Sequence, residues 1–405
     1  MTPQFAQTYR PLYFLSALGM GGLSVSFFMY LMFLVPHPTS PIPRFEDLAA
    51  VYATGNLTAA LLVSLAIAAT AFFAVRHVQL LTTALRAHRD FTRTPAYQQF
   101  RATNAEVSLM AIPLTLAMTV NVVFILAALA VPGLWGVKEW LFPVALLAVT
   151  AIGVFALRMF GAYVTRTLVH RNFDIEDTNH FSQVLPSFAF TMIAVGYSSS
   201  AAMSSTKVTA VLGMIGAFFF LAAAAAWIAL KVPLSWSAML RKGMAVEAGP
   251  TLWLGIPIFT LVGIALIRVT SGIAHTLLDV QVPPIVWFVV FGMLVMGQLA
   301  MGLLGWAVMR KQGYFATYVR GEGRSIASYG LICPGVALSV LGMFFIHWGL
   351  VQTDIVPKLG LAHLTLLGLI LLTQVVTIVT VVRLNAKLLG SPAPVPSELR
   401  VAELV

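Results

Sequence analysis

Cysteine and charge are scarce in this chain of 405 residues. Cys333 is its one cysteine, which excludes an intrachain disulfide and a zinc site built on several cysteines. Charged residues make up 9% of the sequence, whereas ordinary soluble domains have about 25%. Hydrophobic residues make up 59%, and the mean hydropathy is +0.91. These values predict an integral membrane protein.

Acidic side chains are missing from the apolar segments. None of the 14 Asp and Glu residues lies deep in one, although proton-coupled carriers and cation channels usually need a buried carboxylate. The chain has no phosphate-binding loop, no dinucleotide-binding loop and no metal-ligand spacing, so we expect no enzyme, no cofactor and no metal site. The net charge of +10 does not indicate nucleic acid as a partner, because the basic residues stand where they face membrane lipids.

Ten apolar segments run through the chain, each close to the 17–25 residues that cross a bilayer as a helix. They are residues 12–35, 57–75, 107–131, 139–164, 182–203, 207–230, 252–275, 284–308, 327–348 and 361–386. The first is too long for the apolar core of a signal peptide, so we expect it to be retained. The sequence predicts an all-α membrane domain over residues 1–389 and a short cytoplasmic tail over residues 390–405.

Basic residues gather at alternate ends of these segments. Eighteen of the 24 Lys and Arg residues lie at one set of ends: Arg10, Arg76, Arg86, Arg89, Arg93, Arg101, Arg166, Arg171, Lys231, Arg241, Lys242, Arg310, Lys311, Arg320, Arg324, Arg383, Lys387 and Arg400. The opposite loops hold Arg44, Lys138, Lys207 and Lys358. Because basic loops stay in the cytoplasm, we expect a multi-pass protein of the inner membrane with both termini cytoplasmic.

Prolines recur at a regular interval. Pro113, Pro186, Pro257 and Pro334 lie near the cytoplasmic ends of the third, fifth, seventh and ninth segments, 73, 71 and 77 residues apart. Proline removes a backbone hydrogen bond and kinks a helix. A repeat of two helices predicts five hairpins in a quasi-fivefold bundle, with the kinked odd-numbered helices around a central pore.

Small and hydroxylated residues form stripes on the same helices. The predicted pore-lining residues are Ser16, Gly19, Ser26, Asn121, Ser187, Thr191, Ser198, Thr260, Gly263 and Ser339. Their spacing of three, four or seven residues puts those of one helix on one face. Small residues are also preferred where membrane helices pack together, so tight packing is the alternative interpretation.

Two arginines lie inside the apolar segments. Arg268, in the outer half of the seventh, has no acidic residue on any segment to pair with it, and it could attract an anion into an outer vestibule. The alternative is that its side chain reaches the outer headgroups. For Arg158, in the fourth segment, we expect the side chain to reach the inner headgroups.

Short motifs resemble the tellurite-resistance/dicarboxylate transporter family, which includes the TehA-like proteins and the slow-type anion channels. Pro11-Leu12-Tyr13-Phe14 followed by Gly19-Met20-Gly21-Gly22-Leu23 is similar to the first helix of that family, Leu185-Pro186 to the fifth, and Ser328-Tyr329-Gly330-Leu331-Ile332-Cys333-Pro334 to the ninth. The resemblance implies a homotrimer with one pore in each subunit. It also implies a phenylalanine plug just before the ninth-helix proline, where this chain has Cys333. Phe190, one turn beyond Pro186, is the substitute gate candidate.

The sequence thus favours a membrane channel or passive transporter for a small anion. The alternative is a membrane anchor subunit of a redox complex that binds quinol or haem. Four histidines near the outer ends of the segments, His37, His275, His347 and His363, suggest this second function.

Overall fold

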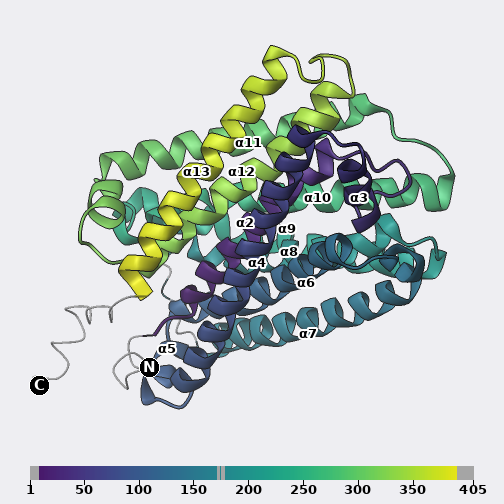
Figure 1. The fold of residues 1–405 in the computed structure, drawn as a ribbon. Helices are drawn as coiled ribbons and strands as arrows, with labels where there is room; N and C mark the ends of the chain where they lie inside the picture. The colour runs from purple at the N-terminus through teal and green to yellow at the C-terminus, as the bar shows by residue number, and fades with distance from the viewer. Residues whose placement is uncertain (1–8, 171–173, 175–177, 390–405) are drawn as a thin grey trace, which may run out of the picture.

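The computed structural model describes residues 9–170, 174 and 178–389 (Figure 1). Within these ranges every regular element is a helix, and ten helices are long and apolar enough to cross a membrane. The predicted number of spans and the all-α class are confirmed. The predicted tail, residues 390–405, lies outside the described residues.

The odd-numbered spans share one construction, a short 3₁₀ helix followed by an α-helix. The pairs are η1 (Pro11–Tyr13) and α2 (Phe14–Leu34), η2 (Asn104–Met110) and α6 (Ala111–Ala130), η5 (Phe181–Val184) and α8 (Leu185–Met203), η6 (Val246–Trp253) and α10 (Gly255–Gly272), and η9 (Ile326–Leu331) and α12 (Ile332–Phe344). These five α-helices are called the inner helices below.

The repeated prolines mark the junction of the two helix types. Pro113, Pro186, Pro257 and Pro334 are each the second or third residue of the α-helical part. The first four N–H groups of an α-helix have no partner within it, so proline costs no hydrogen bond there. At each of these prolines, where a kink was expected near one end of the span, the helix type changes from 3₁₀ to α.

The even-numbered spans are long helices with fewer interruptions. They are α4 (Leu57–Phe91), α7 (Lys138–His170), α9 (Lys207–Lys242), α11 (Pro284–Lys311) and α13 (Leu361–Leu389), called the outer helices below. Residues 76–106, between the second and third predicted segments, are mostly helical. α4 continues to Phe91 because no Gly or Pro interrupts it, and α5 (Pro95–Arg101) follows.

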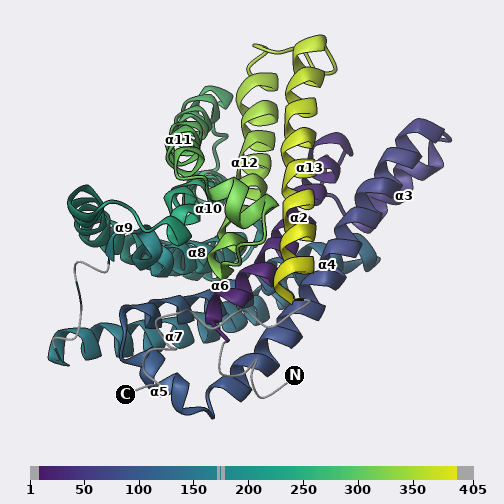
Figure 2. The ribbon, with the colours of Figure 1, turned by 90° about the vertical axis from the view of Figure 1, so that its left-hand side faces the viewer.

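The inner helices contact one another in a closed cycle, α2 with α6, α6 with α8, α8 with α10, α10 with α12, and α12 with α2. Their 3₁₀ segments repeat the same cycle. Figure 2 shows α4, α7, α9 and α11 at the outside of this group. Of the most apolar 18 residues in each span, 61–89% are buried in the inner spans and 22–28% in the outer ones.

Three segments of π-helix and one short helix complete the fold. η7 (Ile273–Leu278) follows α10, η10 (Phe345–Val351) follows α12, and η8 (Phe315–Arg320) follows α11. α3 (Phe45–Ala53) lies in the loop between α2 and α4 and packs on α4 and α6. A 3₁₀ turn, η3 (Leu134–Val137), precedes α7.

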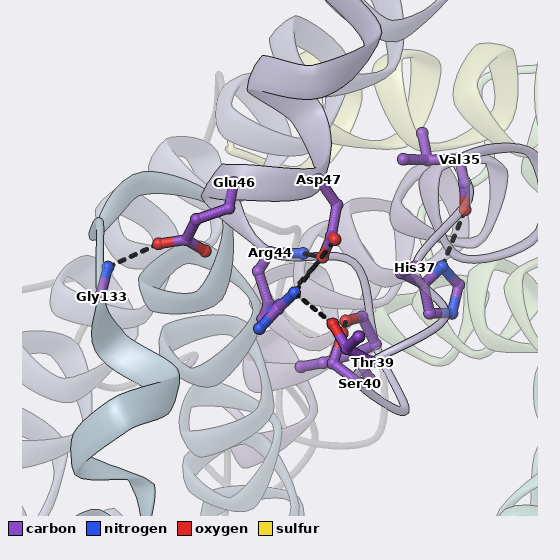
Figure 3. A network of polar contacts seen from close by, with 9 residues as sticks. Val35, His37, Thr39, Ser40, Arg44, Glu46, Asp47 and Gly133 are labelled. Carbon is purple, nitrogen blue, oxygen red and sulfur yellow. Dashed lines mark hydrogen bonds and ion pairs between the residues drawn. The ribbon is translucent and has the colours of Figure 1, made fainter.

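Hydrogen bonds fasten the loop that carries α3 (Figure 3). Asp47 accepts the backbone N–H of Arg44 at the start of the helix and forms an ion pair of 2.9 Å with the Arg44 guanidinium. The adjacent Glu46 points the other way and accepts the backbone N–H of Gly133 at 2.6 Å. This hydrogen bond from Gly133 holds the pKa of Glu46 below its ordinary value. The loop after α2 is thereby tied to the loop after α6.

Candidate functional site

The inner helices enclose a cavity of about 120 Å³ in their midst. All five contribute to its wall, for example through Met29, Phe124, Phe188, Thr260 and Val340. Most of the lining side chains are aliphatic, aromatic or methionine, and Asn121, Ser199, Thr260 and Cys333 are the uncharged polar ones. The cavity is therefore apolar with a few polar atoms, which is the usual composition of a small-molecule site.

Three of the predicted pore-lining residues, Gly19, Asn121 and Thr260, do line this cavity. The other seven, Ser16, Ser26, Ser187, Thr191, Ser198, Gly263 and Ser339, do not belong to its wall. A hydroxyl-lined path was expected, but the wall of the cavity is mainly apolar. Most of these hydroxyls bond to carbonyls of their own helix instead, such as Ser198 to Val195 and Ser339 to Gly335.

The fifth span illustrates why the stripes were misplaced. Ser187 donates to the carbonyl of Ala224 on the outer helix α9, whereas the cavity is lined by Phe188 and Met192, one position after Ser187 and Thr191. One residue is about 100° around a helix. The small and hydroxylated stripe faces a neighbouring helix, as the packing alternative supposed.

Arg268 is the single charged residue that lines the cavity among the residues that the structure describes. Its Nη1 donates to the carbonyl oxygen of Val195 at 3.1 Å. No ion pair within the described residues involves it. Because a guanidinium has five N–H donors, several of them are free to meet a ligand. Arg158, by contrast, lies on the exposed face of α7.

Asn121 and Thr260 are held by hydrogen bonds within the protein. Thr260 donates to the carbonyl of Ala337 at 2.9 Å and accepts from Gln298 of α11 at 2.6 Å. The amide nitrogen of Asn121 donates to the carbonyl of Ala117 at 3.1 Å. Gln298 was not among the predicted site residues, although a glutamine in the middle of an apolar span signals a bond between helices.

The position expected for the gate candidate Phe190 is contradicted by the structure. Its ring packs against Phe160 of α7 and Phe220 of α9, with centroids 5.2 and 5.8 Å away, and it is absent from the cavity wall. Phe188, two residues earlier, faces the cavity instead. Two residues are about 200° apart around a helix, so Phe188 and Phe190 face opposite sides of α8. Cys333, at the plug position implied by the resemblance, lines the cavity.

Two of the four outer histidines, His347 and His363, are in direct contact. The Nε2 atoms of His347 and His363 are 3.3 Å apart, and both side chains are buried. This direct contact leaves no room for an iron between the two rings, as a haem with two axial histidines would require. No group of three or more potential metal ligands occurs within the described ranges.

No protein family, curated protein or solved structure matches this chain.

Proposed function

We propose that the chain is a membrane channel or passive transporter that moves a small anion through a pore within each subunit. The observation that carries this proposal is the cavity between the five inner helices, whose single charged lining residue, within the described part of the chain, is Arg268. A cation in an apolar wall attracts anions and repels cations, because the low dielectric strengthens both interactions.

The apolar wall also sets which anions would pass. A small anion must shed much of its hydration shell between side chains that offer few hydrogen bonds in return. Arg268 is the principal compensating group, and Nη1 already bonds to Val195. Weakly hydrated monovalent anions should therefore pass more readily than sulfate or phosphate.

The proposal also covers the arrangement of the helices, the oligomeric state and the location of the protein in the cell. Five hairpins around a quasi-fivefold axis are supported by the closed cycle of inner helices and by contacts between successive spans, such as α8 with α9 and α12 with α13. The recurring junction of 3₁₀ and α-helix at each proline supports a repeat. Membership of the tellurite-resistance/dicarboxylate transporter family, a homotrimer, and an inner-membrane location with cytoplasmic termini belong to the proposal as well.

Occlusion is assigned to Phe188. This ring is 2% exposed and lies in the cavity wall two residues after Pro186, close to the start of α8. A bulky ring in a narrow apolar path blocks ions sterically and by keeping water out. Conduction then requires the ring to turn away.

Reconstitution in liposomes tests the function. Protein in vesicles should carry chloride, nitrate and thiocyanate down their gradients, with thiocyanate fastest, and should not carry potassium or sulfate. A lack of flux for every anion, or a flux of cations, would contradict the proposal. An absorption spectrum of the purified protein tests the redox alternative, because a haem Soret band would favour a membrane anchor of a redox complex.

A further inference from the structure

A chain of hydrogen bonds with a fixed direction runs through His347 and His363. The backbone N–H of Leu359 donates to Nδ1 of His363 at 3.0 Å, so this nitrogen carries no proton. Nδ1 of His347 lies 2.9 Å from the carbonyl oxygen of Met343, which can only accept, so this nitrogen carries one. The proton between the two Nε2 atoms therefore belongs to His363. Both rings are neutral in this arrangement.

The pair lies where several elements meet. His347 is 5% exposed and His363 is fully buried. From α2, the ring of Phe33 stacks on His347 with centroids 4.4 Å apart. From the connection over residues 352–360, the charge of Lys358 acts on both rings. α11 packs on η10 with aromatic side chains, through Phe288 on Phe345 and Trp287 on Trp348. No carboxylate in the described part of the chain is ion-paired with either histidine.

The pair is linked to the cavity through aromatic rings. Phe33, stacked on His347, meets Phe344 edge-on with centroids 5.2 Å apart. Phe344 lines the cavity three residues before His347. A displacement of His347 would therefore move a side chain of the cavity wall. His347 also lies in the π-helix η10, a helix type that often marks functional positions.

We propose that His347 and His363 form an acid-sensitive latch that fastens the end of α12 to α13 and holds Phe344 against the cavity. A proton added to Nε2 of His347 would face the N–H of His363. A proton added to Nδ1 of His363 would face the N–H of Leu359. Either addition sets donor against donor in a buried site beside Lys358, so the chain breaks and the two helices part.

A metal ion is not the ligand that this pair fits. A metal bound at Nε2 of His363 needs the proton on Nδ1, where a donating N–H of Leu359 already points. Protonation is the change to which the geometry responds. The consequence for anion passage rests on the proposed function, whereas the latch itself does not.

Cys333 reports on the latch without any engineered label, because it lines the cavity and is the one cysteine of the chain. Its rate of reaction with 4,4′-dithiodipyridine is measured on the purified protein and divided by the rate of a free thiol at the same pH. From about pH 8 to about pH 5, the range in which histidine ordinarily titrates, this ratio should rise about tenfold.

Two variants and one control define the result. His347→Phe keeps an aromatic ring against Phe33 but cannot be protonated, and His363→Gln can turn its amide to suit either state of His347. Each should reduce the rise to less than about twofold, so the test survives if one variant fails to fold. His275→Gln, at an exposed histidine in η7, should keep the full rise. An unchanged ratio in the wild type, or a full rise in the variants, would overturn the latch.

Anion flux at the same pH values separates the two proposals. Flux that increases with acid in the wild type but not in the variants supports the coupling to Phe344. A pH-dependent ratio without flux of any anion supports the latch and contradicts the proposed function. Anion flux and a Cys333 reactivity ratio that both stay constant with pH contradict the latch but agree with the proposed function.

Discussion

The inner and outer helices of this protein overlap in hydropathy but differ in how far they are buried. Mean hydropathy over the most apolar 18 residues is 1.2–2.2 in the inner spans and 2.0–2.3 in the outer ones. The buried share of the same residues is 61–89% against 22–28%. In a membrane, lipid tails and protein interior are both apolar, so hydropathy identifies a span without telling which neighbours it has. Burial against protein distinguishes the two groups better.

The strongest test of this contrast replaces a glycine at an inner contact. A Cβ on Gly272, at the end of α10, would overlap the backbone carbonyl of Ala201 at the end of α8. Backbone cannot yield as a side chain can, so Gly272→Ala should cost about 3 kcal/mol or more and reduce the yield of folded protein sharply. Thermal unfolding in detergent measures the loss.

The matched control lies on an outer helix. A Cβ on Gly368 of α13 would meet nothing within 4 Å. Alanine is the better helix former by about 1 kcal/mol, so Gly368→Ala should leave the unfolding temperature unchanged or raise it slightly. Equal losses in the two variants would mean that inner and outer helices do not differ in packing.

Two phenylalanines on α8 allow a cavity-facing side chain to be compared with an outward-facing one in their effect on anion conductance. Phe188 lines the cavity, and Phe190 faces the outer helices α7 and α9. Phe188→Ala should raise passive anion conductance by at least about tenfold, because it removes the ring that blocks the path. Phe190→Ala should leave conductance at the wild-type level and lower stability by about 3–5 kcal/mol. Vesicle flux assays on folded fractions of both variants decide between them. A rise for Phe190→Ala alone would place the block on the other face of α8.

A smaller change in anion flux is expected from substitutions at the two arginines within the spans. Arg268 lines the cavity, whereas Arg158 is exposed on an outer helix. Arg268→Gln removes the charge of the cavity wall and should lower anion flux about five- to tenfold without unfolding the protein. Arg158→Gln should change flux less than twofold, because its side chain is exposed and does not line the cavity. Flux unaffected by Arg268→Gln across several anions would remove this residue from the site.

Hydropathy was sufficient for the ten spans, and the regularly spaced prolines lie on the helices that contact one another in the closed cycle. The orientation of each helix was not predictable in the same way. Ser187 and Thr191 were predicted to line the pore because they are polar. A hydroxyl in a membrane helix can instead bond to a backbone carbonyl of its own helix, as Thr191 does, or of a neighbouring helix, as Ser187 does. Nothing local distinguishes such a hydroxyl from one that faces a cavity. Arg268 was found because a charge inside a span has few alternatives to a polar or enclosed site.

The contact between His347 and His363 was beyond a sequence argument for a different reason. The two residues are 16 positions apart on successive spans, and only the turn over residues 352–360 decides whether their rings meet. Gln298 poses the same difficulty, since its partners Ile256 and Thr260 are about 40 residues away on another helix. Polar residues inside spans could be identified, but their partners could not.

The smallest effect is expected in the loop that joins an inner helix, α2, to an outer one, α4. Glu46 of α3 accepts the N–H of Gly133, and this bond lowers the pKa of its carboxyl. A lowered pKa means that the carboxylate adds stability above the pKa of an unfolded Glu, about 4.3, and that this stability is lost as the pH falls through the lower value of the folded state. Glu46→Gln should therefore lower the unfolding temperature by up to about 2 °C at pH 7, and the difference should shrink as the pH falls through the pKa of the folded state. Unfolding curves of wild type and variant across this range give the measurement. A difference that persisted in acid would show that the amide disturbs the packing of α3 on α4 and α6, rather than weakening a charged hydrogen bond.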